Sequence, residues 1–226
     1  MTKNTHTLFE DNPVSDVESQ RIASALRSSG VWIAVIWLVS IIVGFALRGG
    51  WVPALDLPIL NWIHAHQVPW LQEVMRIITL GGYWPAYVVM LALLLVVLVP
   101  KKQGRTWLIL ALNAALTWGA NNLMKVIFNR ERPLDFFQIE QDGLSYPSGH
   151  AMVAVAVYLL AALMIAKAFP NLKCLAVVLG VASFLPGLSR LFMGVHYPSD
   201  VLMGWLLGVA CAAFWYQIWL REGAGQ

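Results

Sequence analysis

Apolar runs long enough to cross a lipid bilayer recur along the chain, and they constrain its fold more than any other feature. A transmembrane helix needs about 20 predominantly apolar residues. Six runs approach this length: 31–47, 84–99, 107–124, 151–168, 174–191 and 201–220. The composition agrees, because 59% of the 226 residues are hydrophobic and only 12% are charged, which is too few polar residues to cover a water-soluble globule. The sequence therefore predicts an all-α integral membrane bundle of six transmembrane helices.

The excess of basic residues is better explained by membrane topology than by nucleic acid. The net charge is +3, but the chain has no basic arm and no aromatic-basic platform of the kind that binds nucleic acid. If the N-terminus is inside, the positive-inside rule accounts for these cations: Lys3, Arg21, Arg27, Lys101, Lys102, Arg105, Lys167, Lys173 and Arg221. Cys174 and Cys211 fall in different runs at incompatible depths, which predicts neither a disulfide nor a metal site.

The start of the chain predicts a cytosolic tail rather than a cleaved signal peptide. Residues 1–29 mix acidic and basic side chains, unlike the basic start and short apolar core of a signal peptide. We predict this tail, a six-span domain over residues 30–221, and a second cytosolic tail over residues 222–226. The expected location is a bacterial plasma (inner) membrane, with both termini in the cytosol.

The segment over residues 49–83 joins the first two runs on the outer side. Its apolar residues at helical spacing predict a short interfacial helix: Leu71, Val74, Met75 and Ile78. This helix either shapes a lipid entrance or only packs at the interface. His64 and His66 have no third ligand candidate nearby, so no metal site is predicted there.

Charged and histidine residues gather where four of the predicted spans reach the outer face. Three short blocks carry them: Lys125 with Arg132; Ser148, Gly149 and His150; and Ser189, Arg190, His196 and Asp200. An ionisable group at membrane depth costs roughly 2.5 to 3.5 kcal/mol on insertion scales, so several groups that converge on one face indicate a functional site.

The chemistry of these residues suits a phosphate group. Three cations, Lys125, Arg132 and Arg190, match a ligand with about two negative charges, and the guanidinium groups can bind phosphoryl oxygens in bidentate fashion. Ser148 and Gly149 stand at a helix N-terminus, where free backbone N–H groups favour an anion. The pattern predicts a binding site for a phosphate monoester or for the end of a diphosphate.

The two histidines and the aspartate suit a transfer reaction at phosphorus. His150 is placed to donate a proton to the departing oxygen, and His196 to attack phosphorus if its imidazole is neutral. Asp200 follows His196 by about one helical turn, so its carboxylate can accept the other imidazole N–H. We treat His196, His150 and Asp200 as the candidate catalytic residues.

Each of these residues also has a structural alternative. The cations can be anchors at span ends, the histidines hydrogen-bonded core residues, and Ser148 and Asp200 helix caps. Ser189 either positions Arg190 or satisfies a backbone carbonyl. Arg130 is interpreted as an ion-pair partner of Glu131 or Asp135. A metal site on the loop with Asp135, Glu140 and Asp142 is conceivable, but three fixed cations can do the charge work of a metal.

These blocks resemble the signature of the type 2 phosphatidic acid phosphatase (PAP2) superfamily. Its first part, Lys, six residues, Arg-Pro, occupies residues 125–133; its second, Pro-Ser-Gly-His, residues 147–150; and its third, Ser-Arg, five residues, His, three residues, Asp, residues 189–200. The resemblance implies a phosphohistidine on His196 oriented by Asp200, and His150 as general acid. It also implies phosphate binding by Lys125, Arg132, Ser148, Gly149 and Arg190; to this set we add Ser189. It implies no cofactor and no metal.

The resemblance further implies a lipid phosphatase whose partners are the membrane and a lipid phosphate within it. Small bacterial membrane members of the family are the best match, with the site on the outer, periplasmic face. Undecaprenyl diphosphate is the favoured substrate, followed by phosphatidylglycerophosphate and phosphatidic acid. Two alternatives remain: a phosphotransferase that moves phosphate from a polyprenyl diphosphate to another lipid, and a non-catalytic protein that binds or transports lipid phosphates. No sequence feature indicates a protein partner.

Overall fold

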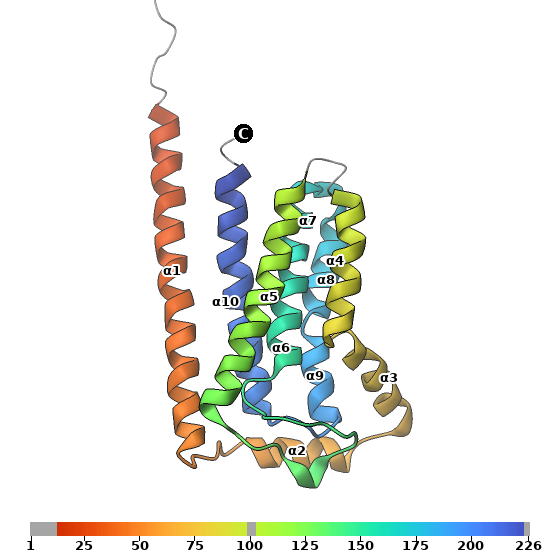
Figure 1. Cartoon of the computed structure of the whole chain (residues 1–226). Helices are drawn as coiled ribbons and strands as arrows, with labels where there is room; N and C mark the ends of the chain where they lie inside the picture. Colours follow the sequence, from red (N-terminus) through yellow and green to blue (C-terminus); the bar gives the residue numbers. More distant parts are fainter. Residues whose placement is uncertain (1–12, 99–102, 224–226) are drawn as a thin grey trace, which may run out of the picture.

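The fold is known from a computed structural model that describes residues 13–98 and 103–223. In these ranges the regular structure consists of helices, drawn in Figure 1: α1 (Pro13–Arg48), α2 (Asp56–Ala65), α3 (Pro69–Leu80), α4 (Trp84–Leu98), α5 (Gly104–Phe128), η1 (Leu134–Phe136), α6 (Gly149–Ala154), η2 (Val155–Leu159), α7 (Leu160–Ala168), η3 (Pro170–Leu172), α8 (Lys173–Ala182), α9 (Leu185–Phe192) and α10 (Pro198–Gly223). Lys3, Lys101, Lys102 and the last three residues of the C-terminal tail, to which predictions were attached, lie outside the described residues.

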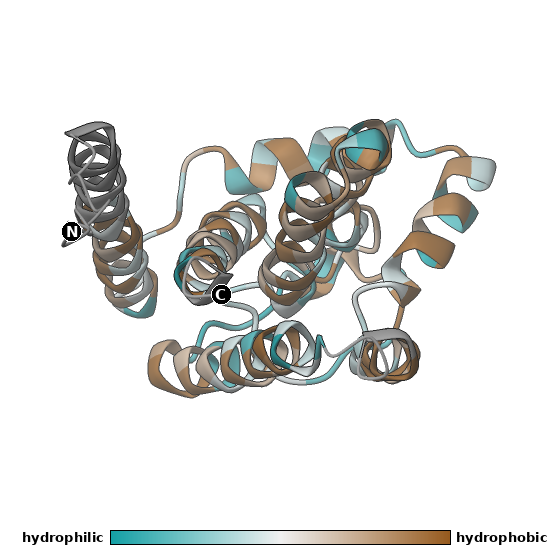
Figure 2. Cartoon of the chain, turned by 90° about the horizontal axis from the view of Figure 1, so that it is seen from above, coloured by the Kyte–Doolittle hydropathy of each residue, from teal (hydrophilic) through white to brown (hydrophobic). Residues whose placement is uncertain are grey.

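The long helices stand side by side, and the short ones cover one end of them. In Figure 1, α1, α4, α5, α8 and α10 run roughly parallel, whereas α2 lies across the lower end and α3 leans outward there. Seen along the bundle, hydrophobic residues are present on helices all around it (Figure 2). Large apolar side chains point outward and have no protein neighbour to bury them, as expected for lipid-facing positions: Trp32, Leu38, Leu93, Val96, Val177 and Val181.

The number of spans differs from the prediction. Among the described residues, four helical segments are long and apolar enough to cross a membrane: Gly30–Arg48, Gly149–Ala168, Pro170–Phe192 and Pro198–Arg221. A fifth arises if α3 and α4, which meet at a 54° bend, form one broken span. The predicted run 107–124 lies within the 25-residue α5, which is not among these segments because buried asparagines such as Asn113 and Asn121 interrupt its apolar character. Six spans are therefore not confirmed, whereas an all-α, multi-pass membrane bundle is.

The segment between the first two runs contains two helices, not one. α3 covers the predicted helical positions, and Met75 packs against Met193 and Val195 with Leu71 and Ile78 beside it. The apolar face of α3 is thus partly covered by the chain that follows α9. The predicted tail also differs in form, because its residues 13–29 continue α1.

A close helix contact places the start of α6 against α10. A Cβ atom built on Gly204 would lie 2.8 Å from the Ser148 carbonyl oxygen, and one built on Gly208 would lie 2.6 Å from that of Met152. Side chains at these positions would force the helices apart, so the glycines allow the close approach that is common between membrane helices. This contact fixes the residues before α6 relative to those that begin α10.

Candidate active site

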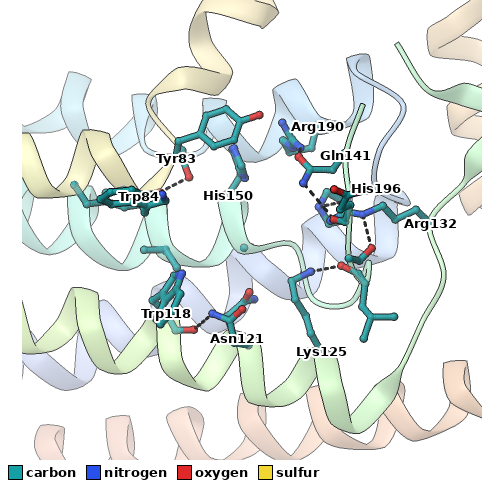
Figure 3. Close-up of a pocket in the computed structure, with 18 residues that line it drawn as sticks. Tyr83, Trp84, Trp118, Asn121, Lys125, Arg132, Gln141, His150, Arg190 and His196 are labelled. Carbon is teal, nitrogen blue, oxygen red and sulfur yellow. Dashed lines mark hydrogen bonds between the residues drawn. The ribbon is translucent and has the colours of Figure 1, made fainter. Parts of the chain in front are cut away.

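A cavity of about 290 Å³ lies where α4 and α6 begin and α5 ends. These helix ends are at the end of the bundle that carries α2 and α3 (Figure 1). Its walls come from α4, α5, the start of α6, α9 and the loop before α6 (Figure 3). Six of the nine predicted site residues line it: Lys125, Arg132, Gly149, His150, Arg190 and His196. Residues more than 60 positions apart in the sequence therefore share one cavity.

Two backbone turns deliver these side chains to the cavity. α5 ends at Asn129, which adopts the left-handed conformation with φ 48°; the chain therefore turns away after Lys125 and brings Arg132 back. After α9, Gly194 has φ 67°, and a Cβ atom built there would lie 1.8 Å from the Phe136 carbonyl oxygen. Only glycine fits this position, which directs the chain to His196.

The contacts of His196 fix the tautomer that a nucleophile needs. The ring is buried, with 2% of its surface exposed, and its Nε2 lies 3.0 Å from Arg132 Nη1. A guanidinium group only donates hydrogen bonds, so Nε2 must be the acceptor and carries the lone pair. The proton then resides on Nδ1, which faces the Asp200 carboxylate at 3.6 Å. In this tautomer Nε2 carries a lone pair, which Arg132 contacts in the structure and which must be released from that contact before it attacks phosphorus.

Ser145, which the sequence analysis missed, lies between Asp200 and His196. Its hydroxyl group is 2.5 Å from Asp200 Oδ2 and 3.3 Å from His196 Nδ1. The same carboxylate oxygen accepts the backbone N–H of Tyr197 at 2.9 Å. Ser145 thus helps to hold Asp200 against His196. Its only signal in the sequence is its position three residues before Ser148.

Each of the three cations donates to the loop before α6, and the two arginines also donate to residues outside that loop. Lys125 Nζ donates to the carbonyl groups of Leu144 and Ser145. Arg132 donates to the carbonyl groups of Asp142, Gly143 and Val195. Arg190, which is fully buried, donates to Thr79 Oγ1 at 2.8 Å and to the side-chain oxygen of Gln141. Figure 3 shows Arg132, Arg190 and Lys125 around the same space as His150 and His196.

Three buried polar atoms at the site have no hydrogen-bond partner among the described residues. They are His150 Nε2, Ser148 Oγ and Arg190 Nε. Leaving such atoms unpaired costs free energy, so each is expected to have a partner in the working state. A phosphoryl group in the cavity supplies acceptor oxygens for His150 Nε2 and Arg190 Nε, whose residues line it. The ring of Tyr83 packs edge-on against His150 at a centroid distance of 4.6 Å and limits where that ring can move.

Three predicted residues lie behind the cavity wall. Asp200 and Ser148 are linked by their backbones, because Ser148 N donates to the Asp200 carbonyl oxygen at 3.1 Å. Ser148 occupies the N-cap position of α6, but its side chain makes no capping hydrogen bond. Ser189 Oγ donates to the Pro186 carbonyl oxygen at 2.7 Å, so the alternative in which it satisfies a backbone carbonyl is confirmed.

The predicted partners of Arg130 are wrong. Its guanidinium group pairs with Asp56 at 2.7 Å and with Asp200 at 2.5 Å, rather than with Glu131 or Asp135. Burial alone would lower the pKa of Arg130, but the two carboxylates raise it above its ordinary value. The sequence alone could not show this pairing because Asp56 lies 74 positions away.

The described residues contain no group of three or more His, Cys, Asp or Glu side chains arranged to hold a metal ion. His66 Nδ1 lies 2.8 Å from the Trp62 carbonyl oxygen, and His64 Nδ1 lies 3.4 Å from Gln67 Nε2. Cys174 and Cys211 are free thiols.

The charge distribution around His196 predicts a specific pH dependence. Burial lowers the pKa of His196 well below 6.5, and the positive charges of Arg132, Lys125 and Arg190 lower it further. If His196 is the nucleophile, protonation removes activity as the pH falls, so the acid limb of kcat/KM should lie below pH 6.5. Replacing Arg132 by Gln removes one of these charges and should move the limb upward by about 1 unit.

The measurement is kcat/KM from pH 4 to 9 at constant ionic strength in detergent. Arg76→Gln, which removes an exposed cation of α3, is the control and should leave the limb in place. An acid limb that does not move in Arg132→Gln contradicts the assignment of His196 as the titrating base.

Comparison with known proteins identifies relatives for most of the chain. The sequence model of the PAP2 superfamily matches residues 106–224. Phosphatidylglycerophosphatase B of Bacillus subtilis is 32% identical over 182 residues, which cover 77% of this chain and 88% of that protein. Undecaprenyl-diphosphatase of Sulfolobus acidocaldarius is 27% identical over 192 residues, which cover 81% of this chain and 88% of that protein. The crystal structure of a transmembrane PAP2-type phosphatidylglycerolphosphate phosphatase from Bacillus subtilis superposes with a TM-score of 0.76 at 26% identity, over 84% of this chain and 96% of that one.

Proposed function

Because the chain belongs to the PAP2 superfamily and is a membrane lipid phosphatase, we propose that it removes the terminal phosphate of a lipid by way of a phosphohistidine on His196. The observation that carries this proposal is the convergence on one cavity of His196 Nε2, held as an acceptor, with His150 and three cations. A binding or transport protein needs the cations but has no use for a nucleophile and an acid.

The proposed reaction has two steps, each balanced in atoms and protons. His196 Nε2 forms a bond to phosphorus while the bond from phosphorus to the lipid oxygen breaks, and His150 gives that oxygen its proton. Water then attacks phosphorus, the bond to Nε2 breaks, and His150 takes the proton from water. Lys125, Arg132 and Arg190 hold the phosphoryl oxygens and stabilise the charge that develops on them.

The Asp200 carboxylate keeps the His196 ring in place through both steps. Its Oδ2 faces Nδ1 at 3.6 Å, so the positive charge that the ring gains when Nε2 bonds to phosphorus lies beside a carboxylate. A carboxylate orients the catalytic histidine of Ser-His-Asp triads in the same way, where the histidine is the general base and the acid does not take up the proton.

The shape of the cavity supports a lipid as the substrate. Beyond the polar end, its walls include Tyr87 and Trp84 of α4 and Trp118 of α5. Both tryptophans are more than half exposed on the outside of the bundle, where lipid tails lie in a membrane. We infer that the head group enters between α4 and α5 while the tail stays in the bilayer. Phosphatidylglycerophosphate and undecaprenyl diphosphate, named for the two relatives, both present a terminal phosphoryl group.

The distribution of cations supports a periplasmic site in a bacterial inner membrane. Arg105, Lys167, Lys173 and Arg221 lie at the ends of helices that Figure 1 places opposite α2 and the cavity. With that end in the cytosol, the positive-inside rule holds. Six membrane crossings follow if α3 and α4 form one broken span and α5 also spans.

The test is phosphate release from a panel of lipids by the purified protein in detergent. We expect turnover of phosphatidylglycerophosphate or undecaprenyl diphosphate that is unchanged, to within about twofold, by excess EDTA, because fixed cations supply the positive charge at phosphorus. The panel also includes phosphatidic acid, and the ratios of kcat/KM identify the preferred lipid. Loss of activity in EDTA that Mg²⁺ restores would contradict the proposed metal-independent reaction, and phosphate that appears only on an added lipid acceptor would indicate a transferase.

A further inference from the structure

A chain of buried charges lies on the side of Asp200 away from His196. Arg130 bridges two carboxylates, with Nη1 2.5 Å from Asp200 Oδ1 and Nη2 2.7 Å from Asp56 Oδ2. Asp56 and Asp200 are 1% and 0% exposed. Buried charges are tolerated when they are paired and hydrogen-bonded, and here both carboxylates share one guanidinium group.

Asp56 also ties α2 to the first turn of α10. Its Oδ1 accepts the backbone N–H of Ser199 at 2.8 Å, and its Oδ2 accepts the Ser199 hydroxyl group at 2.6 Å. This is the arrangement of a helix N-cap, supplied by a residue of another helix. The guanidinium group of Arg130 lies 4.0 Å above the ring of Tyr197, so the same residues fix the chain between His196 and Asp200.

The hydrogen bonds of Asp200 leave it one orientation. Arg130 occupies Oδ1, and the Ser145 hydroxyl and the Tyr197 N–H occupy Oδ2, which is also the oxygen that faces His196. Without Arg130, the carboxylate could rotate away from the ring. With Arg130 but without Asp56, the positive charge of Arg130 would cancel much of the negative charge that Asp200 presents to His196.

We propose that Asp56 and Arg130 are positioning residues of the reaction, which orient Asp200 toward His196 and keep the group of three charges net negative. This proposal rests on the assignment of His196 and Asp200 made above. It gives α2, a helix outside the bundle, a direct part in catalysis, because the helix supplies the carboxylate that balances Arg130. Asp56 is the only acidic residue between Glu18 and Glu73.

The effect on pH dependence has a definite sign. The charged and titratable groups that face His196 are Lys125 from α5, Arg132 from the loop after it, His150 from α6, Arg190 from α9 and Asp200 from α10. Replacing Asp56 by Asn makes the surroundings of this set more positive, which disfavours protonation of His196 further. The acid limb of kcat/KM should therefore move to lower pH, opposite to the shift expected for Arg132→Gln.

The test compares Asp56→Asn with Asp135→Asn in the full-length protein in detergent, with the lipid that the panel shows to be turned over. Asparagine keeps the shape of the side chain and its acceptor for Ser199 N–H. We expect kcat to fall about 10- to 100-fold with KM within about twofold, together with the shift of the acid limb. Asp135 is exposed, with no ion pair among the described residues, and Asp135→Asn should change neither quantity. Wild-type kcat in Asp56→Asn, or a lower kcat with an unmoved limb, overturns the proposal.

A second variant separates orientation from charge. Arg130→Lys retains the positive charge, but an ammonium group cannot bridge two carboxylates as the guanidinium fork does. It should lower kcat without moving the acid limb. If both variants lose the monodisperse folded peak in size-exclusion chromatography, the pair serves folding and the positioning role is wrong.

The same series distinguishes this inference from the function on which it rests. Activity that survives in His196→Ala and Asp200→Asn removes the proposed mechanism itself. Inactive His196→Ala and Asp200→Asn beside a fully active Asp56→Asn removes only the positioning role of Asp56 and Arg130.

Discussion

Replacing His196 by alanine is expected to reduce kcat for lipid phosphate hydrolysis by about 10⁴-fold or more, while the protein stays folded. The reason is that His196 Nε2, which Arg132 contacts at 3.0 Å, is the atom assigned to attack phosphorus. Loss of a covalent nucleophile removes the whole two-step path, and a 10⁴-fold decrease corresponds to about 5.4 kcal/mol of barrier. The measurement is phosphate release in detergent for each lipid of the panel.

A matched control for His196→Ala is His66→Ala. His66 is an exposed residue of the α2 end, and its ring contacts Trp62 rather than the cavity. This control should keep wild-type activity. Rapid acid-free quenching with radiolabelled lipid phosphate should trap a phosphoenzyme in the wild-type protein and none in His196→Ala. Activity of His196→Ala within tenfold of wild type would falsify the assignment of the nucleophile.

Replacing His150 by glutamine is expected to reduce activity by an amount that depends on the leaving group. A general acid contributes about 10²- to 10⁴-fold, and its contribution is largest when the departing oxygen is strongly basic. Hydrolysis of phosphatidylglycerophosphate releases an alcohol, whose oxygen is strongly basic as it departs, so kcat for this lipid should fall about 10³-fold. Hydrolysis of undecaprenyl diphosphate releases a lipid phosphate, which is a weaker base than an alkoxide and depends less on protonation by His150. p-Nitrophenyl phosphate releases p-nitrophenolate, a much weaker base than an alkoxide, so kcat for this substrate should fall by less than about tenfold.

The structural basis for the His150 prediction is the unpartnered Nε2 atom in the cavity. Tyr83 holds the ring by an edge contact, and a Cβ atom built on Gly82 would lie only 2.3 Å from His150 Cδ2. The ring is thus confined from the α3–α4 side. An equal loss for all three substrates would contradict an acid role and would assign His150 to phosphate binding. The comparison needs kcat for each substrate, since KM reports binding as well.

The positions of the candidate site residues were more accessible from the sequence than the number of membrane spans. The signature positions could be read directly, and Lys125, His150, Arg190 and His196 meet in one cavity because helix ends on one membrane face are close in any compact bundle. The number of spans was less accessible. Hydropathy alone does not show that α5 buries Asn113 and Asn121 among its neighbours, where they bond to the Ala156 and Pro147 carbonyl groups.

The supporting residues of the site were missed for a physical reason. Asp56, Gln141 and Ser145 act through contacts across 49 to 143 positions of sequence, and no local pattern encodes such a contact. Asp56 could have been noticed as a lone acid in an apolar segment, since a charge in such a place needs a partner. Its partner, Arg130, was assigned to nearby acids because proximity in sequence was the only guide.

The three cations donate hydrogen bonds to the loop before α6. These bonds limit how tightly the protein can bind a free anion. Lys125, Arg132 and Arg190 each have protein acceptors in the structure, from Leu144, Gly143 and Gln141. A phosphoryl oxygen that enters must replace these acceptors, so the free energy of binding is the difference between two sets of charge-assisted hydrogen bonds. That difference is smaller than the full free energy of the new bonds, which favours release of an anion alone. Retention of the substrate then depends on its hydrocarbon tail, which the departing inorganic anion does not have.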